Sequence, residues 1–122
     1  MKVFQTEEIR NIALIGAAKS GKTTLAENMI FEGKLINRKG ATENKNTVSD
    51  YRPIEMERGI SVNASLCYTI FNDKKINILD TPGFSDFSGD IVACLSAVDT
   101  AVFTVNSQSG VEATSENAWK HA

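Results

Sequence analysis

Residues 12–24 read I-A-L-I-G-A-A-K-S-G-K-T-T, and this stretch decides the fold. Its first four residues form a short apolar run, which is typical of a strand covered on both faces. Residues 16–23 match the pattern G-x-x-x-x-G-K-[ST], in which glycines let backbone N–H groups surround a polyphosphate at the N-terminus of a helix. The following turns place four apolar side chains on one helical face: Leu25, Ala26, Met29 and Ile30. The stretch therefore predicts a strand, a phosphate-binding loop and a helix from Lys22 to Phe31.

The phosphate loop predicts roles for individual side chains. The Lys22 ammonium is expected to reach the β- and γ-phosphates of a nucleotide, and the Thr23 hydroxyl is expected to bind Mg²⁺. The residues expected to contact the nucleotide in this segment are Gly16, Ala17, Ala18, Lys19, Ser20, Gly21, Lys22, Thr23 and Thr24. A glycine-rich turn without a ligand is the alternative interpretation of the same pattern.

A second motif follows another apolar strand, Ile76–Asp80 (I-N-I-L-D), and reads T-P-G-F at 81–84. Asp80 ends the strand, where folds of this kind place the carboxylate that holds Mg²⁺ through water. A helix-capping or strand-end aspartate is the alternative for Asp80. Gly83 has no Cβ, so its N–H can approach a γ-phosphate. Hydrolysis would remove that contact, and we therefore expect an order–disorder switch here.

The remaining pattern predicts an α/β fold. Residues 62–71 alternate between apolar and polar, which indicates a half-buried strand at a sheet edge. The turn N-D-K-K at 72–75 joins it to the strand at 76–80 as an antiparallel hairpin. Further predicted elements are a helix with Ile91, Val92, Leu95 and Val98 on one face, a buried strand at 101–105 and a helix at 112–122. Residues 34–61 show no period, and we interpret them as a functional loop.

Composition indicates a single domain without a strong charge bias. The chain has 122 residues, a hydrophobic content of 42% and a net charge of −2, so DNA is not an expected partner. Its sequence contains no apolar run near 18 residues, so a membrane is not expected either. Cys67 and Cys94 fit no metal or redox spacing, which predicts plain thiols in a reducing cytoplasm. Cys94 is expected to be buried and His121 to lie on the surface. Trp119 and Val111 are expected in the core.

Four segments resemble the start of the GTP-binding domain of translational GTPases, in particular elongation factor G and its paralogues. They are the phosphate loop, E-R-G-I-S-V at 57–62, D-T-P-G-F-S-D-F at 80–87 and S-Q-S-G-V-E at 107–112. The resemblance implies that residues 1–122 are the N-terminal portion of a truncated, three-layer P-loop GTPase fold. Its sheet would be mostly parallel, with one antiparallel edge strand and the strand order 2-3-1-4. It implies GTP or GDP and Mg²⁺ as ligands, the ribosome as partner and a cytoplasmic location.

Within the resemblance, one residue keeps the family chemistry and two depart from it. Ser61 stands where the family has a Mg²⁺-coordinating threonine and keeps the hydroxyl. Phe84 stands where the family has a histidine that helps to orient water, and a phenyl ring cannot do this. Lys19 replaces an aspartate of the phosphate loop, which predicts either added attraction for the nucleotide or a solvated loop residue.

The function expected from the resemblance is GTP hydrolysis by a factor that drives translocation on the ribosome, with hydrolysis weakened by Phe84. Alternatives are a ribosome-binding switch that scarcely hydrolyses GTP, and an ATP-dependent P-loop enzyme. Recycling and ribosomal protection also stay open, as does the base, because no N-K-x-D segment is present.

The strand at 101–105 is expected to leave one edge of the sheet unpaired. We therefore predict self-association through this edge or through the uncovered face of the last helix, together with low stability and disorder over Lys39–Gly59.

Overall fold

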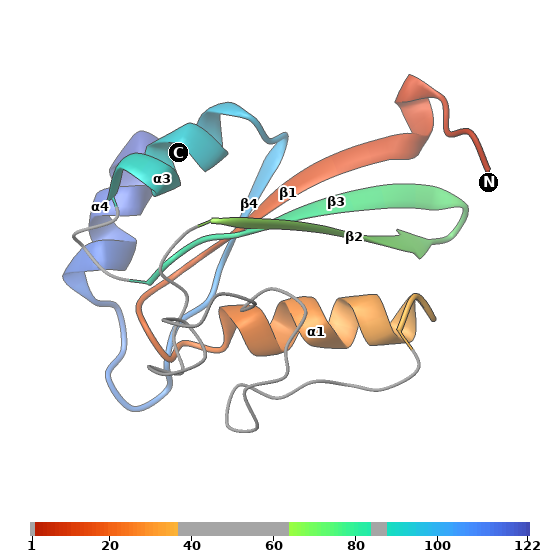
Figure 1. Ribbon diagram of the computed structural model, residues 1–122. Helices are drawn as coiled ribbons and strands as arrows, with labels where there is room; N and C mark the ends of the chain where they lie inside the picture. The colour runs from red at the N-terminus through yellow and green to blue at the C-terminus, as the bar shows by residue number, and fades with distance from the viewer. Residues whose placement is uncertain (1, 37–63, 84–87) are drawn as a thin grey trace.

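The structure is a computed structural model that describes residues 2–36, 64–83 and 88–122 of the chain. Four strands form one sheet in the order β2-β3-β1-β4 (Figure 1). In chain order the elements are a 3-10 helix η1 (Thr6–Glu8), β1 (Ile9–Ile15), α1 (Lys22–Glu32), β2 (Ser65–Phe71), β3 (Lys74–Asp80), α3 (Ser88–Ser96), β4 (Thr100–Phe103) and α4 (Ala113–His121). β1 is parallel to β3 and β4, whereas β2 is antiparallel to β3. The mostly parallel sheet with one antiparallel edge strand is confirmed.

The β2–β3 hairpin is closed by a two-residue turn. Asn72 and Asp73 have φ angles of 48° and 61°, and left-handed values at both positions fit the turn type that matches strand twist. Phe71 pairs with Lys74 at the position next to the turn. The turn thus brings β3 back along the sheet, where it pairs with β1.

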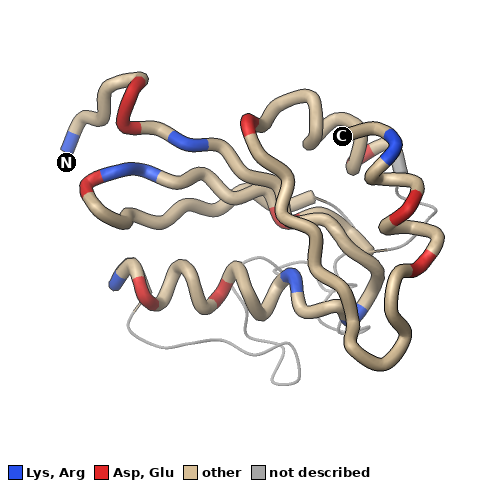
Figure 2. The backbone as a smooth tube through the Cα atoms, turned by 180° about the vertical axis from the view of Figure 1, so that it is seen from behind, with Lys and Arg blue, Asp and Glu red and all other residues tan. Residues whose placement is uncertain are grey.

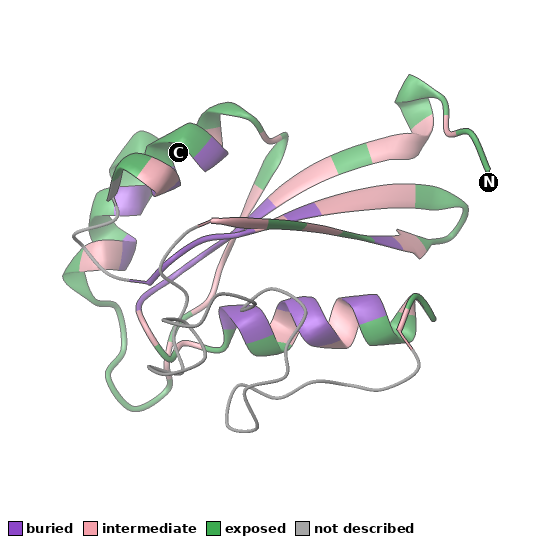
Figure 3. Cartoon of the chain, in the orientation of Figure 1, coloured by how far each residue is buried: buried purple, intermediate pink, exposed green. Residues whose placement is uncertain are grey.

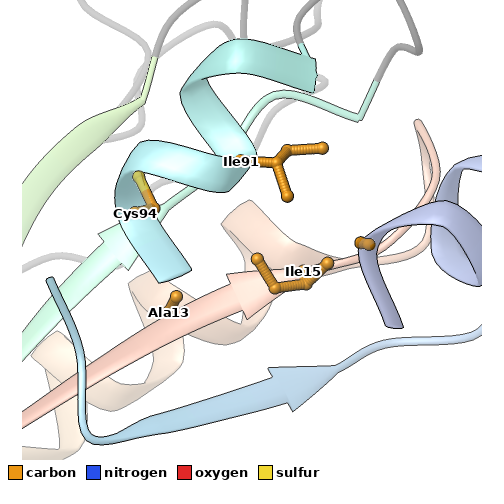
Figure 4. Close-up of a cluster of buried hydrophobic side chains, with 5 residues drawn as sticks. Ala13, Ile15, Ile91 and Cys94 are labelled. Carbon is orange, nitrogen blue, oxygen red and sulfur yellow. The ribbon is translucent and has the colours of Figure 1, made fainter. Parts of the chain in front are cut away.

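Helices cover both faces of the sheet and give three layers (Figure 3). Side chains alternate across β1, so Leu14 packs on the α1 side with Ala26, Ile30 and Ile78. The opposite cluster combines the β1 side chains of Ala13 and Ile15 with α3 and α4 (Figure 4): Ala13, Ile15, Ile91, Cys94 and Ala118. Burying one large aliphatic side chain in this way contributes about 1.5–3 kcal/mol. The predicted burial of Cys94 is confirmed.

Several boundaries differ from the pattern in the sequence. β1 begins at Ile9, because Arg10 and Asn11 continue its parallel pairing with β3. The polar side chain of Asn11 is accommodated by hydrogen bonds, since it accepts one from Asn77 Nδ2 at 2.8 Å and donates one to Asp99 Oδ2 at 3.3 Å. Gly33 is the C-cap of α1, as its position predicts.

The prediction that Trp119 and Val111 belong to the core is wrong. Their exposed fractions are 69% and 71%. α4 instead buries its small residues Ser115 and Ala118, so that Trp119 points outward. The centroids of the Trp119 and Phe103 rings lie 5.3 Å apart in an edge-to-face arrangement. His121 is exposed, as predicted.

Parts of the sequence-based prediction lie outside the described residues. These are the start of the strand at 62–63, the loop at 39–59, and residues Ser61 and Phe84. In the part of the chain that is described, no helix has the length and hydropathy needed to cross a membrane. Basic and acidic residues are interspersed along the described chain (Figure 2), in line with the small net charge.

Candidate phosphate- and metal-binding site

The phosphate loop connects the end of β1 to the first residue of α1. Gly21, the N-cap of α1, has a φ of +95°, a conformation that side chains with a Cβ rarely adopt. Lys19 is exposed at φ +61°. Mixed right- and left-handed residues turn successive N–H groups toward one side, and backbone cavities for anions form in this way. The loop therefore has the backbone geometry of an anion site at a helix N-terminus.

Lys22 is the buried cation of this loop. Its Nζ donates hydrogen bonds to the carbonyl oxygens of Gly16 at 2.9 Å and Ala17 at 2.7 Å. A buried ammonium is costly unless its donors are used. The two carbonyls therefore fix the charge within the loop itself, beside the N-terminus of α1.

Thr23 and Asp80 meet at the carboxyl ends of two neighbouring parallel strands. Leu14 of β1 is in register with Asp80 of β3, so the end of β3 lies beside the start of the phosphate loop. The Thr23 hydroxyl donates a hydrogen bond to Asp80 Oδ2 at 2.7 Å, and both side chains are buried. The pair places a hydroxyl and a carboxylate, both ligands suited to Mg²⁺, next to the lysine of the loop.

The segment after Asp80 runs along the phosphate loop. The Thr81 hydroxyl donates to the carbonyl of Leu14 at 2.7 Å, and residues 81–83 are buried. Gly83 is packed so closely that a Cβ there would overlap with the backbone nitrogen of Ala18 and lie 2.7 Å from the carbonyl carbon of Ala17. The absence of a side chain at Gly83 is therefore required for this close approach.

A buried carboxylate behind the site escaped the sequence analysis. Glu27 lies one turn after Thr23 on α1, on the same helical face, and is only 1% exposed. Burial raises the pKa of the Cys67 thiol to about 12, with smaller contributions from the charges of Asp80 and Glu27. Both carboxylates therefore oppose ionisation of the Cys67 thiol on β2. Nothing in the sequence signals this burial, because a charged residue between the apolar pairs 25–26 and 29–30 is ordinary in an amphipathic helix.

The structure brings most of the predicted site residues together. Residues 16–23, Asp80 and Gly83 surround one region at the carboxyl edge of the sheet. Thr24 is exposed on α1, and its carbonyl accepts a hydrogen bond from Asn28. Ser61 and Phe84 lie outside the described residues, and the roles assigned to the individual residues stay predictions.

Proteins of known family resemble the chain over nearly its whole length. The family model for the elongation factor Tu GTP binding domain matches residues 7–122. The mitochondrial ribosome-releasing factor 2 of Candida dubliniensis is 40% identical over 119 residues, which are 98% of this chain and 15% of that protein. Its counterpart in Schizosaccharomyces pombe is 36% identical over 93% of this chain and 14% of that protein. The chain thus spans about one seventh of the length of these relatives.

Solved structures agree with this result. A crystal structure of a protein from Thermus thermophilus superposes with a TM-score of 0.90 and 36% identity, covering 94% of this chain and 17% of that one. The bacterial selenocysteine-specific elongation factor shows the same fold, with a TM-score of 0.75 and 23% identity. The superposition covers 93% of this chain and 17% of that chain. With its phosphate loop and the carboxylate at the end of β3, the chain belongs to the family of the elongation factor Tu GTP binding domain.

Proposed function

We propose that this chain is the GTP-binding and GTP-hydrolysing domain of an elongation factor G-like translation factor that acts on the ribosome. The observation that carries the proposal is the 2.7 Å contact between the Thr23 hydroxyl and Asp80, beside the buried Lys22. Desolvating a cation and an anion is costly, so their burial at this loop favours a site that uses both charges. A polyphosphate site uses both. Family membership supports guanine as the base.

The residues of the loop bind and orient the phosphates. Backbone N–H groups at the start of α1 attract the anion. The Lys22 ammonium is already fixed by the carbonyls of Gly16 and Ala17, so the phosphates meet a positioned charge and little reorganisation is needed.

The oxygen donors present fit Mg²⁺. Thr23 would bind it directly and Asp80 through water, with Ser61 as the third protein ligand. When bound, Mg²⁺ supplies positive charge that neutralises the phosphate oxygens. Gly83 would offer its N–H to the γ-phosphate, because it already lies against the phosphate loop. Loss of that phosphate would release the segment that begins at Gly83.

Hydrolysis is the step at which this chain departs from its family. Phe84 can neither donate nor accept a hydrogen bond and therefore cannot orient the attacking water. This favours, as a second candidate function, a nucleotide-gated switch that engages the ribosome and hydrolyses GTP slowly. Release of phosphate from GTP by the intact factor, measured with and without ribosomes, separates the two: stimulated turnover supports the GTPase and a flat response supports the switch.

Two features of the biological setting come from the relatives. Their name, ribosome-releasing factor 2, supports the ribosome as partner and favours ribosome release beside the expected translocation. Those proteins are named as mitochondrial, whereas the sequence predicted a cytoplasmic location for this chain. Fractionation of cells that express the intact factor, with a ribosome pull-down from each fraction, tests both points.

Nucleotide binding is tested most directly at Lys22. Lys22→Ala should abolish detectable binding of a fluorescent GTP analogue, because the variant lacks the cation placed among the phosphates. The matched control is Lys74→Ala, at the first residue of β3, about 20 Å along the strand from Asp80. Lys74 Nζ donates a hydrogen bond to the backbone carbonyl of Glu7 at 3.5 Å. Equal binding by wild type and Lys22→Ala would contradict the proposal.

A further inference from the structure

The residue that follows β4 lies against the phosphate loop. β4 pairs in parallel with β1, and Ile15 is in register with Phe103. The pairing continues one residue further, because the Thr104 N–H donates to the carbonyl of Ile15 at 2.8 Å. The end of β4 therefore stands on one side of the loop, while the segment after β3 stands on the other.

Side-chain hydroxyls join Thr104 to the loop. Thr104 Oγ1 and Ser20 Oγ lie 2.7 Å apart, although the residues are 84 positions apart in the sequence. Thr104 Oγ1 also donates to the carbonyl of Ile15 at 3.3 Å. A hydroxyl carries one proton, so when Thr104 donates to Ile15, Ser20 donates to Thr104. This chain of bonds spans the loop from the residue before it to its fifth residue.

Gly16 and Asn106 complete the contact. A Cβ at Gly16 would overlap with the carbonyl oxygen of Thr104 and lie 2.6 Å from Ser20 Oγ, so the paired hydroxyls fill the space that a side chain would need. Asn106 Nδ2 approaches the carbonyl of Lys19 at 3.5 Å, a longer and weaker contact. Lys19 has the left-handed conformation that is unfavourable for side chains, and neighbouring contacts of this kind maintain it.

We propose that Thr104 is a positioning residue for the phosphate loop, which it holds in its binding conformation through Ser20, with Asn106 as a weaker second contact. The inference rests on the proposed nucleotide-binding function. A loop that is already ordered loses less conformational freedom when phosphates bind. Because the contact lies within the loop and not at the γ-phosphate, its loss should weaken GDP and GTP to the same extent. Such uniform weakening raises KM and leaves kcat unchanged.

The test uses the intact factor and the release of fluorescent GDP and of a fluorescent, non-hydrolysable GTP analogue. Thr104→Val removes the hydroxyl at nearly constant volume and should speed the release of both nucleotides about three- to tenfold, the range expected for one lost hydrogen bond. Ser20→Ala should do the same. The double variant should release nucleotide no faster than Thr104→Val alone, because that variant already lacks the bond between the two hydroxyls. Thr104→Ser keeps a hydroxyl and should restore release to near the wild-type rate.

The matched control is Thr69→Val. Thr69 is a buried threonine of β2 whose hydroxyl donates to the carbonyl of Met29 at 2.8 Å. Its loss should lower the melting temperature and leave nucleotide release unchanged, which separates positioning from general stability. Wild-type release from a folded Thr104→Val variant, or fully additive effects of the two single variants, would overturn the assignment. A wild-type factor that does not bind GDP would refute the proposed function and this inference together.

Discussion

Gly83→Ala is the perturbation whose effect the structure defines most sharply. The added Cβ would overlap with the Ala18 nitrogen and lie 2.5 Å from Ala18 Cα and 2.7 Å from the carbonyl carbon of Ala17. All three atoms belong to the backbone of the phosphate loop and cannot rotate away as a side chain would. Either the loop or the segment 81–83 must move. Overpacking of this kind costs about 1–3 kcal/mol, so the melting temperature of the variant should fall.

The two nucleotides should respond differently to this change. The proposed N–H contact from Gly83 goes to the γ-phosphate, which GDP lacks. A hydrogen bond to a charged group contributes about 1.5–3 kcal/mol, so displacing Gly83 should weaken GTP by about 10- to 100-fold relative to GDP. The expected signature is therefore a changed ratio of the two affinities.

The assay is a pair of titrations of the intact factor, one with GDP and one with a non-hydrolysable GTP analogue, alongside thermal melts. Gly89→Ala is the matched control, because Gly89 lies in α3 and an added Cβ meets nothing within 4 Å. Alanine in a helix is favoured over glycine by up to about 1 kcal/mol, so this variant should be at least as stable as wild type. An unchanged GTP-to-GDP ratio in a folded Gly83→Ala variant would refute the γ-phosphate contact.

Three further predictions address other parts of the chain. Phe84→His in the intact factor should raise ribosome-stimulated GTP turnover about 10²- to 10⁴-fold, measured as phosphate release, because it restores a group that can position water; wild-type turnover matching that of a histidine-bearing relative would contradict this. Folding raises the pKa of Cys67 from 9.0 to about 12, and the stability linked to this shift is fully present below pH 9. We predict that this stability is lost as the pH rises from 9 to about 12. Denaturant unfolding at about pH 8 and pH 10.5 should show a smaller loss in Cys67→Ala, and equal losses would exclude the thiol as the cause. A polypeptide of residues 1–122 should self-associate through the outer edge of β4 and the exposed Val105 and Trp119, and constant light scattering per mass over a concentration series would show otherwise.

The fold and the phosphate loop were predictable because local pattern and long-range pairing agree there. The apolar run at 12–15, the loop pattern and the end of I-N-I-L-D at Asp80 each predict a separate element. Parallel strands place their carboxyl ends at one edge of the sheet, and the structure joins Thr23 to Asp80 at that edge. Thr23 and Asp80, which are 57 positions apart in the sequence, are therefore joined by a hydrogen bond of 2.7 Å.

The errors and omissions arise where the sequence cannot show which face of an element is covered. Trp119 and Val111 are apolar, yet α4 approaches the sheet through Ser115 and Ala118, which allow closer packing than a large ring. Thr104 lies within the predicted strand at 101–105, where one polar residue looks ordinary, whereas β4 ends one residue before it. Its role depends on Ser20, 84 positions away, and only the parallel pairing of β4 with β1 brings the two together.

The positions of the contacts around the phosphate loop predict that its two sides have different roles in nucleotide binding. The segment after β3 is hydrogen-bonded to β1 through Thr81, but it contacts the loop itself at Gly83, which has no side chain to bond with. The segment after β4 contacts it through hydroxyls that are hydrogen-bonded to the loop and to β1. A contact that has no side-chain bond to the loop can open when the γ-phosphate is lost, whereas a side-chain bond to the loop keeps it in place for either nucleotide. Changes at Gly83 should therefore alter discrimination between GTP and GDP, and changes at Thr104 should alter the affinity for both. Measuring the two affinities in both variants tests this difference in roles, since a shared pattern of effects would mean that the loop responds as a single unit.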